Sequence, residues 1–567
     1  MHESTGPRIR ARSRGLPLAG AILLVAALVG AAPAPAAAPA SGAAASPARE
    51  GAATESGLAT EAALAVLKRG GTAADGMIAA ALTAGVVAPT SSGLGGGGVA
   101  LVYRAEDRSV TALDFRETAP AVIDESAYER RPLPDNERGK LAGVPGEVRG
   151  LAWLHQHFGK RAWGELVQPA ERLARDGFPL EAHTASTIGG KDQARYQRMP
   201  SIERAFFAGG KAGILGQRVR RPELAKTLRT LRTQGPEALY TGALAADIVA
   251  ASAKYGGTLT RNDLARYEVR TRTPLRVAWE GYEILTMPPP SAGGLFLAEV
   301  LGTFTKRELE ETGLRTPLGI HLMAEAMRGA LADRARFVGD PDVLPVDLAR
   351  VLAPARLAAR KARFSPDRTQ AVKALASEEH GTHALVVADA AGNVVVLTTT
   401  VNTAFGCEVA GEQSGIVLND QLDDFTSRAA AATVGVAFPP NVARPGRRPT
   451  SSMMPTLVLQ GGVPVLALGG SGGYAIPASV TETLLAMLVR GETPEAAVRA
   501  PRFRFDSKDY TLLLDNAFGD AARDDLIRRG ETVRMTDATS AVQVLAFGPG
   551  GVTGAADARK GGTARVR

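Results

Sequence analysis

The chain has 567 residues, 45% of them hydrophobic and 22% charged, and this balance excludes a disordered protein. The net charge of +8 is modest for this length, and no basic stripe with interleaved aromatic residues is present, so no nucleic-acid partner is expected. The length suits two to four average domains or one large enzyme core.

Residues 1–38 are typical of a secretory signal peptide. Four arginines between Arg8 and Arg14 precede the apolar run LPLAGAILLVAALVGA, and small residues follow it. Because this run is near the lower length limit for a membrane span, an N-terminal anchor is the alternative. Residues 39–56 are rich in Ala, Pro, Ser and Gly and are expected to form a disordered leader. We therefore expect export to the periplasm or the extracellular space.

Helical patterns dominate the next three hundred or so residues. Helical periodicity is present in ATEAALAVLKRGG, AADGMIAAALTAGVVA, GVPGEVRGLAWLHQHFG and IHLMAEAMRGALADRARF. Between the second and third of these runs, GLGGGGVALVYRAEDRSVTALDF predicts a loop and two strands. Further on, THALVVAD and NVVVLTTTV predict one hairpin, and PTLVLQGGVPVLALGG predicts another. Strands flanked by helices favour a layered α/β or α+β core.

Two glycine-rich motifs partly match known nucleotide-binding and hydrolase motifs. Gly93–Gly98 matches GxGxxG, but a strand follows it instead of a helix, which argues against nucleotide binding. Gly469–Gly473 matches GxSxG between a strand and a helix, but a nucleophile elbow needs a later histidine, and none follows Ser471. This turn is instead expected to present backbone N–H groups that can hold an oxyanion.

No metal or cofactor site is predicted. The sequence contains neither HExxH nor CxxC. The single cysteine, Cys407, is expected to be a packed, inert thiol, because an exported chain with one cysteine has no internal disulfide and no catalytic partner for the thiol is evident.

Two polar segments become informative only when they are taken together. The loop RRPTSSM, at residues 447–453, combines arginines with hydroxyls, and LNDQLDDF, at residues 418–425, carries several carboxylates. Alone, each is an ordinary loop or helix start. An arginine with hydroxyls suits a carboxylate, and an aspartate suits an ammonium group, so together they favour recognition of an α-amino acid end.

From Gly57 to about Asp557 the chain resembles the γ-glutamyltransferases, also called γ-glutamyl transpeptidases, which are N-terminal-nucleophile hydrolases. The motifs that carry the resemblance, in the family's order, are GGTAADGMIAA, GLGGGGVALV, LDFRETAPA, GVPGEVRGL, MPPPSAGG, LTTTVNTAFG, GIVLNDQLDDF, RRPTSSMMPT and GGSGG. The resemblance implies an α+β fold with four αββα layers. It also implies a precursor cleaved between Gly381 and Thr382 into a large subunit (57–381) and a small subunit (382–567).

The resemblance assigns the site residues one by one. Thr382 corresponds to the nucleophile, Thr400 to its supporting threonine and Asn402 to the asparagine of the substrate site. The remaining assignments are Gln421 and Asp424 for the donor's α-amino group, Arg116, Ser451 and Ser452 for its α-carboxylate, and Gly472 and Gly473 for the oxyanion hole. A free N-terminal threonine carries its own base, an α-amine with a pKa near 8, so no catalytic histidine is required.

The implied reaction transfers the γ-glutamyl group of glutathione or a related amide to water, an amino acid or a peptide, without a cofactor. Alternatives are an acylase for another amide, such as a β-lactam side chain or poly-γ-glutamate, and a non-catalytic exported binding protein. The chain departs from the family pattern at His383, Ala384 and Val386, and its lid loop, residues 426–443, is short and lacks an evident tyrosine. Because successive strand residues point to opposite faces, His383 is expected to face away from the site.

Overall fold

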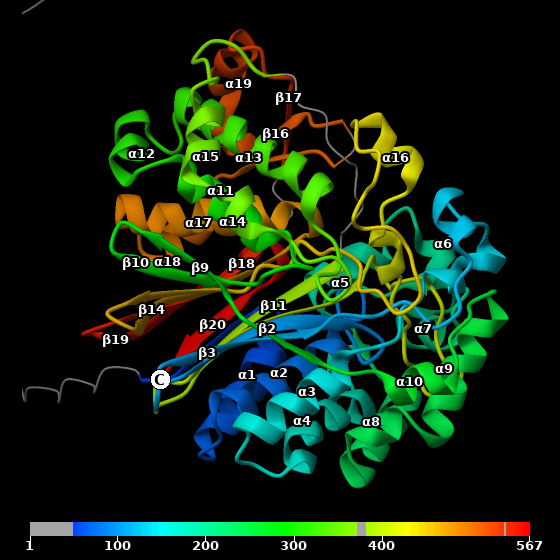
Figure 1. Cartoon of the computed structure of the whole chain (residues 1–567). Helices are drawn as coiled ribbons and strands as arrows, with labels where there is room; N and C mark the ends of the chain where they lie inside the picture. Colours follow the sequence, from blue (N-terminus) through cyan, green and yellow to red (C-terminus); the bar gives the residue numbers. More distant parts are fainter. Residues whose placement is uncertain (1–48, 371–380, 508, 538–539) are drawn as a thin grey trace, which may run out of the picture. The chain divides into compact units, whose positions relative to one another are not determined.

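The computed structural model describes residues 49–370, 381–507, 509–537 and 540–567 (Figure 1). The predicted signal peptide, most of the predicted leader and the residues just before Gly381 lie outside these ranges. In the described part of the chain, no helix combines the length and the apolar character needed to cross a membrane.

Most of the strands belong to two sheets. The strands of the first sheet are β1 (Gly51–Thr54), β2 (Gly97–Arg104), β3 (Ser109–Phe115), β8 (Arg270–Arg272), β11 (Gly381–Ala388), β12 (Val394–Asn402) and β20 (Thr563–Val566). Those of the second are β9 (Leu275–Trp279), β10 (Tyr282–Thr286), β13 (Thr456–Gln460), β14 (Val463–Ser471), β18 (Ala541–Gly548) and β19 (Gly551–Ala556). Short additional strands are β4 (Phe178–Pro179), β5 (Phe207–Ala208), β6 (Lys211–Ala212), β7 (Arg218–Val219), β15 (Phe503–Phe505), β16 (Leu512–Asp515) and β17 (Val533–Thr536).

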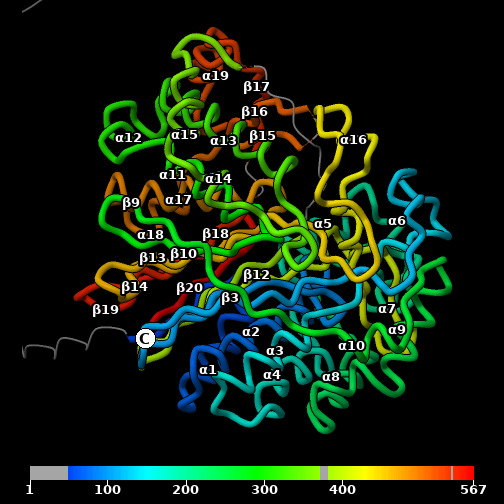
Figure 2. The backbone as a smooth tube through the Cα atoms, in the orientation of Figure 1, coloured from blue at the N-terminus to red at the C-terminus, as the bar shows by residue number. Residues whose placement is uncertain are grey.

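The two sheets are antiparallel and lie one on the other. Over the described residues, the first has the strand order β20-β1-β11-β12-β2-β3-β8 and the second β19-β18-β14-β13-β10-β9. The first described strand, β1, pairs with the last, β20, so the two ends of the described chain lie side by side in the sheet, as Figure 2 shows in blue and red.

Helices cover the outer face of each sheet (Figure 1). Those on the side of the first sheet include α1 (Gly57–Lys68), α2 (Ala73–Val87), α3 (Glu147–Phe158), α4 (Trp163–Asp176) and α8 (Pro222–Gln234). Those on the second include α11 (Gly293–Thr303), α13 (Pro317–Phe337), α17 (Ile476–Arg490) and α18 (Pro494–Arg499). This arrangement is the predicted four-layer αββα sandwich.

The remaining helices lie in the connections. They are α5 (Ala182–Ile188), α6 (Gln193–Tyr196), α7 (Pro200–Phe206), α9 (Gly242–Lys254), α10 (Arg261–Arg266), α12 (Lys306–Thr312), α14 (Leu348–Val351), α15 (Pro354–Lys361), α16 (Arg428–Thr433) and α19 (Gly519–Arg528). Single 3-10 turns include η4 (Gln421–Asp424), η5 (Gly473–Ala475) and η7 (Ala558–Lys560).

The alternation of side chains along β11 determines which way the predicted nucleophile faces. Leu385 and Val387 belong to the core beneath α1 and α2, whereas Val386 and Ala388 belong to the core between the two sheets. By the same period of two, Thr382 faces the second sheet and His383 faces the helices.

The prediction of a disordered leader up to residue 56 is wrong for its last residues. Gly51–Thr54 form β1, which is fully buried between β11 and β20. Its sequence, GAAT, consists of four small residues without alternation, so it gives no strand signal of its own. The strand exists because its two neighbours, both distant in sequence, supply the pairing.

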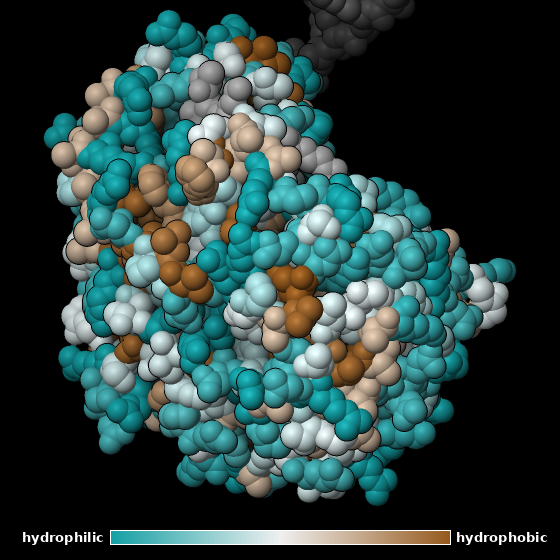
Figure 3. All heavy atoms as spheres, turned by 45° about the vertical axis from the view of Figure 1, so that its right-hand side comes forward, coloured by the Kyte–Doolittle hydropathy of each residue, from teal (hydrophilic) through white to brown (hydrophobic). Residues whose placement is uncertain are grey.

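The face of the molecule shown in Figure 3 is mostly hydrophilic, and its hydrophobic side chains form small, separate groups. Such scattered exposed apolar residues are normal for a folded surface and mark no site by themselves.

Candidate active site

Thr382 stands at the start of β11, directly opposite Thr400 of β12. The pairing register shifts between Gly381 and Thr382, so the strand has an irregularity at the bond that the sequence predicts to be cleaved. The Thr400 hydroxyl donates a hydrogen bond to the Gly381 carbonyl oxygen, and it accepts one from the Asn402 N–H at 2.7 Å. The structure therefore brings Thr382, Thr400 and Asn402 together around the Gly381–Thr382 bond.

The position before Thr382 has room for glycine only. A Cβ atom added to Gly381 would lie 2.7 Å from the carbonyl oxygens of both Asn402 and Thr90. Contacts this short to backbone atoms require the backbone to move. The close backbone packing therefore excludes any side chain at this position.

His383 faces away from Thr382, as expected. It is 1% exposed on the helix-facing side of β11, and burial together with the nearby Lys560 ammonium lowers its pKa to about 3. Its imidazole is therefore neutral at ordinary pH. Among the described residues, its Nε2 has no hydrogen-bond partner.

A second cluster forms around Asp424 of η4. Arg116, which follows β3, donates to the Asp424 carboxylate through Nη2, and Gln421 donates to the same oxygen at 3.0 Å. Arg116 is held in place by the carbonyl oxygens of Pro449 and Thr450, each 2.7 Å from a guanidinium nitrogen. A buried donor and a buried acceptor remain without a partner in the described structure: Nη1 of Arg116 and Oε1 of Gln421.

Ser451 and Ser452 continue the loop whose carbonyls hold Arg116. The Ser451 hydroxyl accepts a hydrogen bond from the Met453 N–H at 3.1 Å. The Ser452 hydroxyl accepts one from Arg334 of α13 at 2.5 Å. Arg334 brings a second guanidinium to this cluster, and the sequence analysis did not identify it, because it lies on a helix that the pattern explains as core.

The segment around Asp420 joins the two clusters. Asn402, with a left-handed φ of 78°, donates from its side chain to the Asp420 carbonyl oxygen at 3.2 Å. The Asp420 carboxyl accepts from the Thr403 hydroxyl at 2.6 Å, and burial raises its pKa to about 8. A carboxyl that is largely protonated near neutral pH adds little negative charge beside Asp424.

Gly472 and Gly473 form the turn between β14 and α17. Their φ values of 116° and 58° are both in the range that favours glycine. A Cβ on Gly472 would lie 2.9 Å from the Cα of Ser540, so a side chain is excluded there. Successive N–H groups in a glycine turn can bind an anion, and the oxyanion role of this turn stays a prediction.

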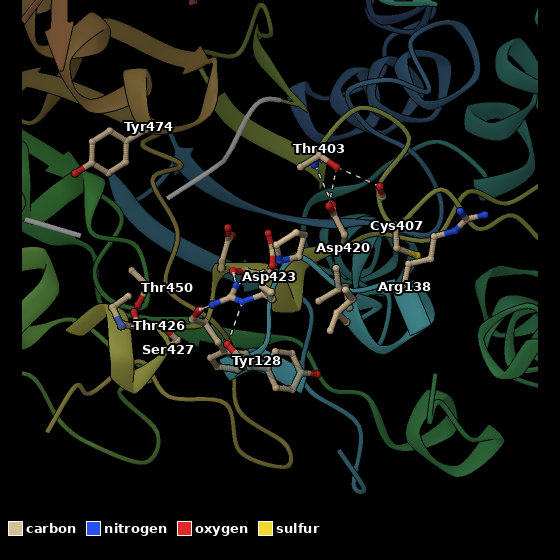
Figure 4. Close-up of a pocket in the computed structure, with 18 of the residues that line it drawn as sticks. Tyr128, Arg138, Thr403, Cys407, Asp420, Asp423, Thr426, Ser427, Thr450 and Tyr474 are labelled. Atoms are coloured by element: carbon tan, nitrogen blue, oxygen red, sulfur yellow. Dashed lines mark hydrogen bonds and ion pairs between the residues drawn. The ribbon is translucent and has the colours of Figure 1, made fainter. Parts of the chain in front are cut away.

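The Asp424 cluster opens into a cavity of about 810 Å³ (Figure 4). Its walls include Asp420, Asp424, Thr450 and Tyr474, whereas Thr382 is only 4% exposed. Cys407 also lines the cavity, but its thiol is buried and burial raises its pKa well above the ordinary range, as suits the predicted inert thiol.

A four-layer αββα sandwich with a threonine at the start of a central strand is the architecture of the N-terminal-nucleophile hydrolases. A comparison with solved structures agrees: the chain superposes on the cephalosporin acylase from Bacillus halodurans with a TM-score of 0.82, covering 94% of this chain and 98% of that one, at 24% identity. At this identity the likeness shows the fold alone.

Sequence comparison identifies the family. Residues 59–566 match the profile described as Gamma-glutamyltranspeptidase. The chain is 36% identical over 448 residues to glutathione hydrolase 2 of Arabidopsis thaliana, covering 77% of each chain. It is 32% identical over 512 residues to the glutathione hydrolase proenzyme of Escherichia coli (strain K12), covering 87% of each. The chain therefore belongs to the γ-glutamyltranspeptidase family and is an acyl-transferring enzyme that acts on γ-glutamyl substrates.

Proposed function

We propose that the chain is the precursor of an exported γ-glutamyltransferase that cuts its own Gly381–Thr382 bond and then uses Thr382 as its nucleophile. The proposed donor is glutathione or a related γ-glutamyl amide. Water, an amino acid or a peptide takes the acyl group. Export rests on the signal-like residues 1–38, and fractionation of cells making the full chain tests it.

One observation carries the donor assignment. Arg116 Nη1 and Gln421 Oε1 are buried without a protein partner in the part of the chain described, and both side chains also contact Asp424. Buried polar groups normally have a partner, so this pair is suited to a bound group. The donor's α-carboxylate complements the guanidinium, and its α-ammonium complements Gln421 Oε1 and the Asp424 carboxylate. A γ-glutamyl group carries both charges on one carbon.

The hydrogen bond from Thr400 supports self-cleavage. In the proposed step the Thr382 hydroxyl oxygen attacks the Gly381 carbonyl carbon, and the Gly381–Thr382 C–N bond breaks as the hydroxyl proton passes to the nitrogen. Water then hydrolyses the resulting ester, which leaves a carboxylate on Gly381 and a free α-amine on Thr382. The Thr400 hydroxyl lies on the carbonyl oxygen where negative charge develops.

Transfer would use the amine released by cleavage. The Thr382 α-amine accepts the hydroxyl proton while Thr382 Oγ1 attacks the γ-carbonyl of the donor. The N–H groups of Gly472 and Gly473 would hold the oxyanion. Collapse of this intermediate releases the donor's amine, which takes the proton, and leaves an acyl-enzyme. Water or an acceptor amine then attacks the ester and restores Thr382.

Two measurements test the proposal together. Intact-mass analysis of the purified protein should find two chains, the smaller beginning at Thr382, and Thr382→Ala should stay whole and inactive. A γ-glutamyl anilide should be turned over, with faster release when a dipeptide acceptor is added. A preparation that turns over a β-lactam side-chain amide or poly-γ-glutamate but no γ-glutamyl anilide would replace this proposal with the acylase alternative.

A further inference from the structure

The strand that carries Thr382 is longer than its neighbour on one side. Strand β1 pairs only with Leu385–Ala388 of β11, so the first residues of β11 extend beyond the end of β1. Two side chains occupy this open edge. The Glu55 carboxylate accepts a hydrogen bond from the Ala384 N–H at 2.8 Å, and Lys560 Nζ lies 3.5 Å from the Thr382 carbonyl oxygen.

Lys560 also contacts the opposite sheet. Its ammonium donates to the Ser471 hydroxyl at 2.8 Å, and Ser471 immediately precedes Gly472. Glu55 Oε2 lies 3.7 Å from the same ammonium. Glu55 is 5% exposed, Lys560 6% and Ser471 0%, so the three form a buried polar cluster behind the nucleophile.

We propose that Lys560 and Glu55 are positioning residues that fix Thr382 relative to the Gly472–Gly473 turn, with Ser471 as the link. The inference rests on the proposed function, since it requires Thr382 to be the nucleophile. The pair takes the place of the missing strand partner of β11, and it holds the backbone that directly follows the Thr382 side chain, at the Thr382 carbonyl oxygen and the Ala384 N–H. One ammonium contacts both the nucleophile's strand and the oxyanion turn, and therefore sets the distance between them.

The Lys560 ammonium also affects the Thr382 α-amine, which is the base in the proposed transfer. Within one residue the nitrogen and carbonyl oxygen are no more than about 3.6 Å apart, so after cleavage the Thr382 α-amine lies within about 7 Å of Lys560 Nζ. A positive charge at that range disfavours protonation of the amine. Lys560 therefore helps to keep the amine neutral, which is the form that accepts the hydroxyl proton.

Two histidines near this cluster are neutral at ordinary pH. His183 of α5 and His383 of β11 both interact with Lys560, and burial lowers their pKa values to about 4 and about 3. For Glu55, burial raises the pKa, while Lys560 and the hydrogen bonds from Ala384 and Ser471 oppose that rise. Because the α-amine is the base in the proposed transfer, the acid limb of the rate profile is expected to include its titration.

The test compares Lys560→Met with Lys560→Arg and Ser471→Ala, in purified, cleaved enzyme with a γ-glutamyl anilide. Lys560→Met should lower kcat by about 10- to 100-fold, as expected for loss of a charge-assisted contact, with KM changed less than about threefold. Its acid limb should move up by about one pH unit, because the charge that disfavoured protonation is gone. Lys560→Arg should keep the wild-type limb. Ser471→Ala should lower kcat without moving the acid limb, because Lys560 and Glu55 are both still present.

Removing one member of a buried ion pair can prevent folding, so the double variant Glu55→Gln/Lys560→Met is made in parallel. It removes both charges at nearly constant volume, which is usually tolerated. Its kcat should still fall about tenfold or more, because the contact to Thr382 is lost. The matched control is Glu531→Gln, which removes the buried carboxylate charge 2.6 Å from Arg328 and 2.8 Å from His321 and touches none of these residues. It should lower the melting temperature but leave kcat and the acid limb unchanged.

Wild-type kcat and an unmoved acid limb in Lys560→Met, or wild-type kcat in the double variant, would overturn the positioning role while leaving the proposed function intact. A wild-type protein that stays one chain and inert, or a Thr382→Ala variant that keeps activity, would overturn both.

Discussion

The Thr400 hydroxyl donates to the Gly381 carbonyl oxygen across the β11–β12 pair. This oxygen belongs to the peptide group whose C–N bond the proposed cleavage breaks. A hydroxyl on the neighbouring strand, fixed by its own contact with the Asn402 N–H, is already placed to stabilise charge on that oxygen.

Replacing Thr400 with valine should slow cleavage of the precursor by about 10- to 100-fold, which is the lower part of the range for losing one oxyanion donor. Thr400→Ser should cleave nearly normally, since it keeps the hydroxyl. The measurement is the fraction of cut chain over time on gels of freshly folded precursor.

Thr398→Val is the matched control for Thr400. Thr398 lies on the same strand and the same face, and its buried hydroxyl has no hydrogen-bond partner among the described residues. Removing that hydroxyl at constant shape should leave the cleavage rate unchanged. Equal slowing of both variants would show that the effect comes from strand packing and not from the Gly381 contact.

Arg116→Ala should raise the KM for the donor by about 10- to 150-fold, the range for one charge-assisted hydrogen bond. The reason is that Nη1 is a buried donor without a protein partner in the described structure, on a guanidinium whose Nη2 contacts Asp424. Arg116→Lys should recover only part of the loss, because an ammonium cannot contact Asp424, two carbonyls and a donor carboxylate at once.

The Arg116 measurement uses steady-state kinetics on enzyme shown by mass to be fully cleaved, so that a processing defect is not taken for a binding defect. A correctly cleaved Arg116→Ala enzyme with the wild-type KM would remove this residue from the donor site.

The β11–β12 hairpin could be predicted from sequence because its information is local. Both strands are apolar runs on either side of a short turn, and the turn fixes the register that places Thr382 opposite Thr400. The donor-binding residues could not be predicted from local pattern, because Arg116 and Asp424 meet only where loops far apart in sequence converge. The family resemblance placed both of them in the donor site.

The cluster around Lys560 could not be predicted in this way. Glu55 and Lys560 are five hundred residues apart, and their contact depends on β1 and β20 meeting in the first sheet. The sequence gives β1 no strand signal, so its pairing, and the open edge of β11 that follows from it, become visible only in three dimensions. Arg334 was not identified from the sequence either, because the pattern of its helix is accounted for by packing alone and gives no sign of a site residue.

His383→Ala should still cleave, with the precursor half-life changed by less than about tenfold, or 1.4 kcal/mol in the barrier. The imidazole faces the helices, away from the scissile bond, and burial holds its pKa at about 3. A group that is neutral throughout the range cannot give a titration between pH 5.5 and 8.5. Time courses of cleavage at several pH values check this. A much slower variant that also loses a titration near pH 6.5 would mean that His383 takes part.

Gly381→Ala should impair cleavage more than its single methyl group suggests. The added Cβ would lie 2.7 Å from the carbonyl oxygens of Asn402 and Thr90, so the backbone around the strand irregularity at Gly381–Thr382 would have to shift. Displacing the scissile carbonyl by about 1 Å from the Thr400 hydroxyl and the Thr382 nucleophile should slow cleavage by roughly 100-fold. Gly548→Ala is the control, because a Cβ there meets nothing within 4 Å. Intact-mass time courses of both precursors decide the matter: a Gly381→Ala chain that is cut as fast as Gly548→Ala would show that the tight packing around Gly381 does not hold the scissile bond in its reactive position.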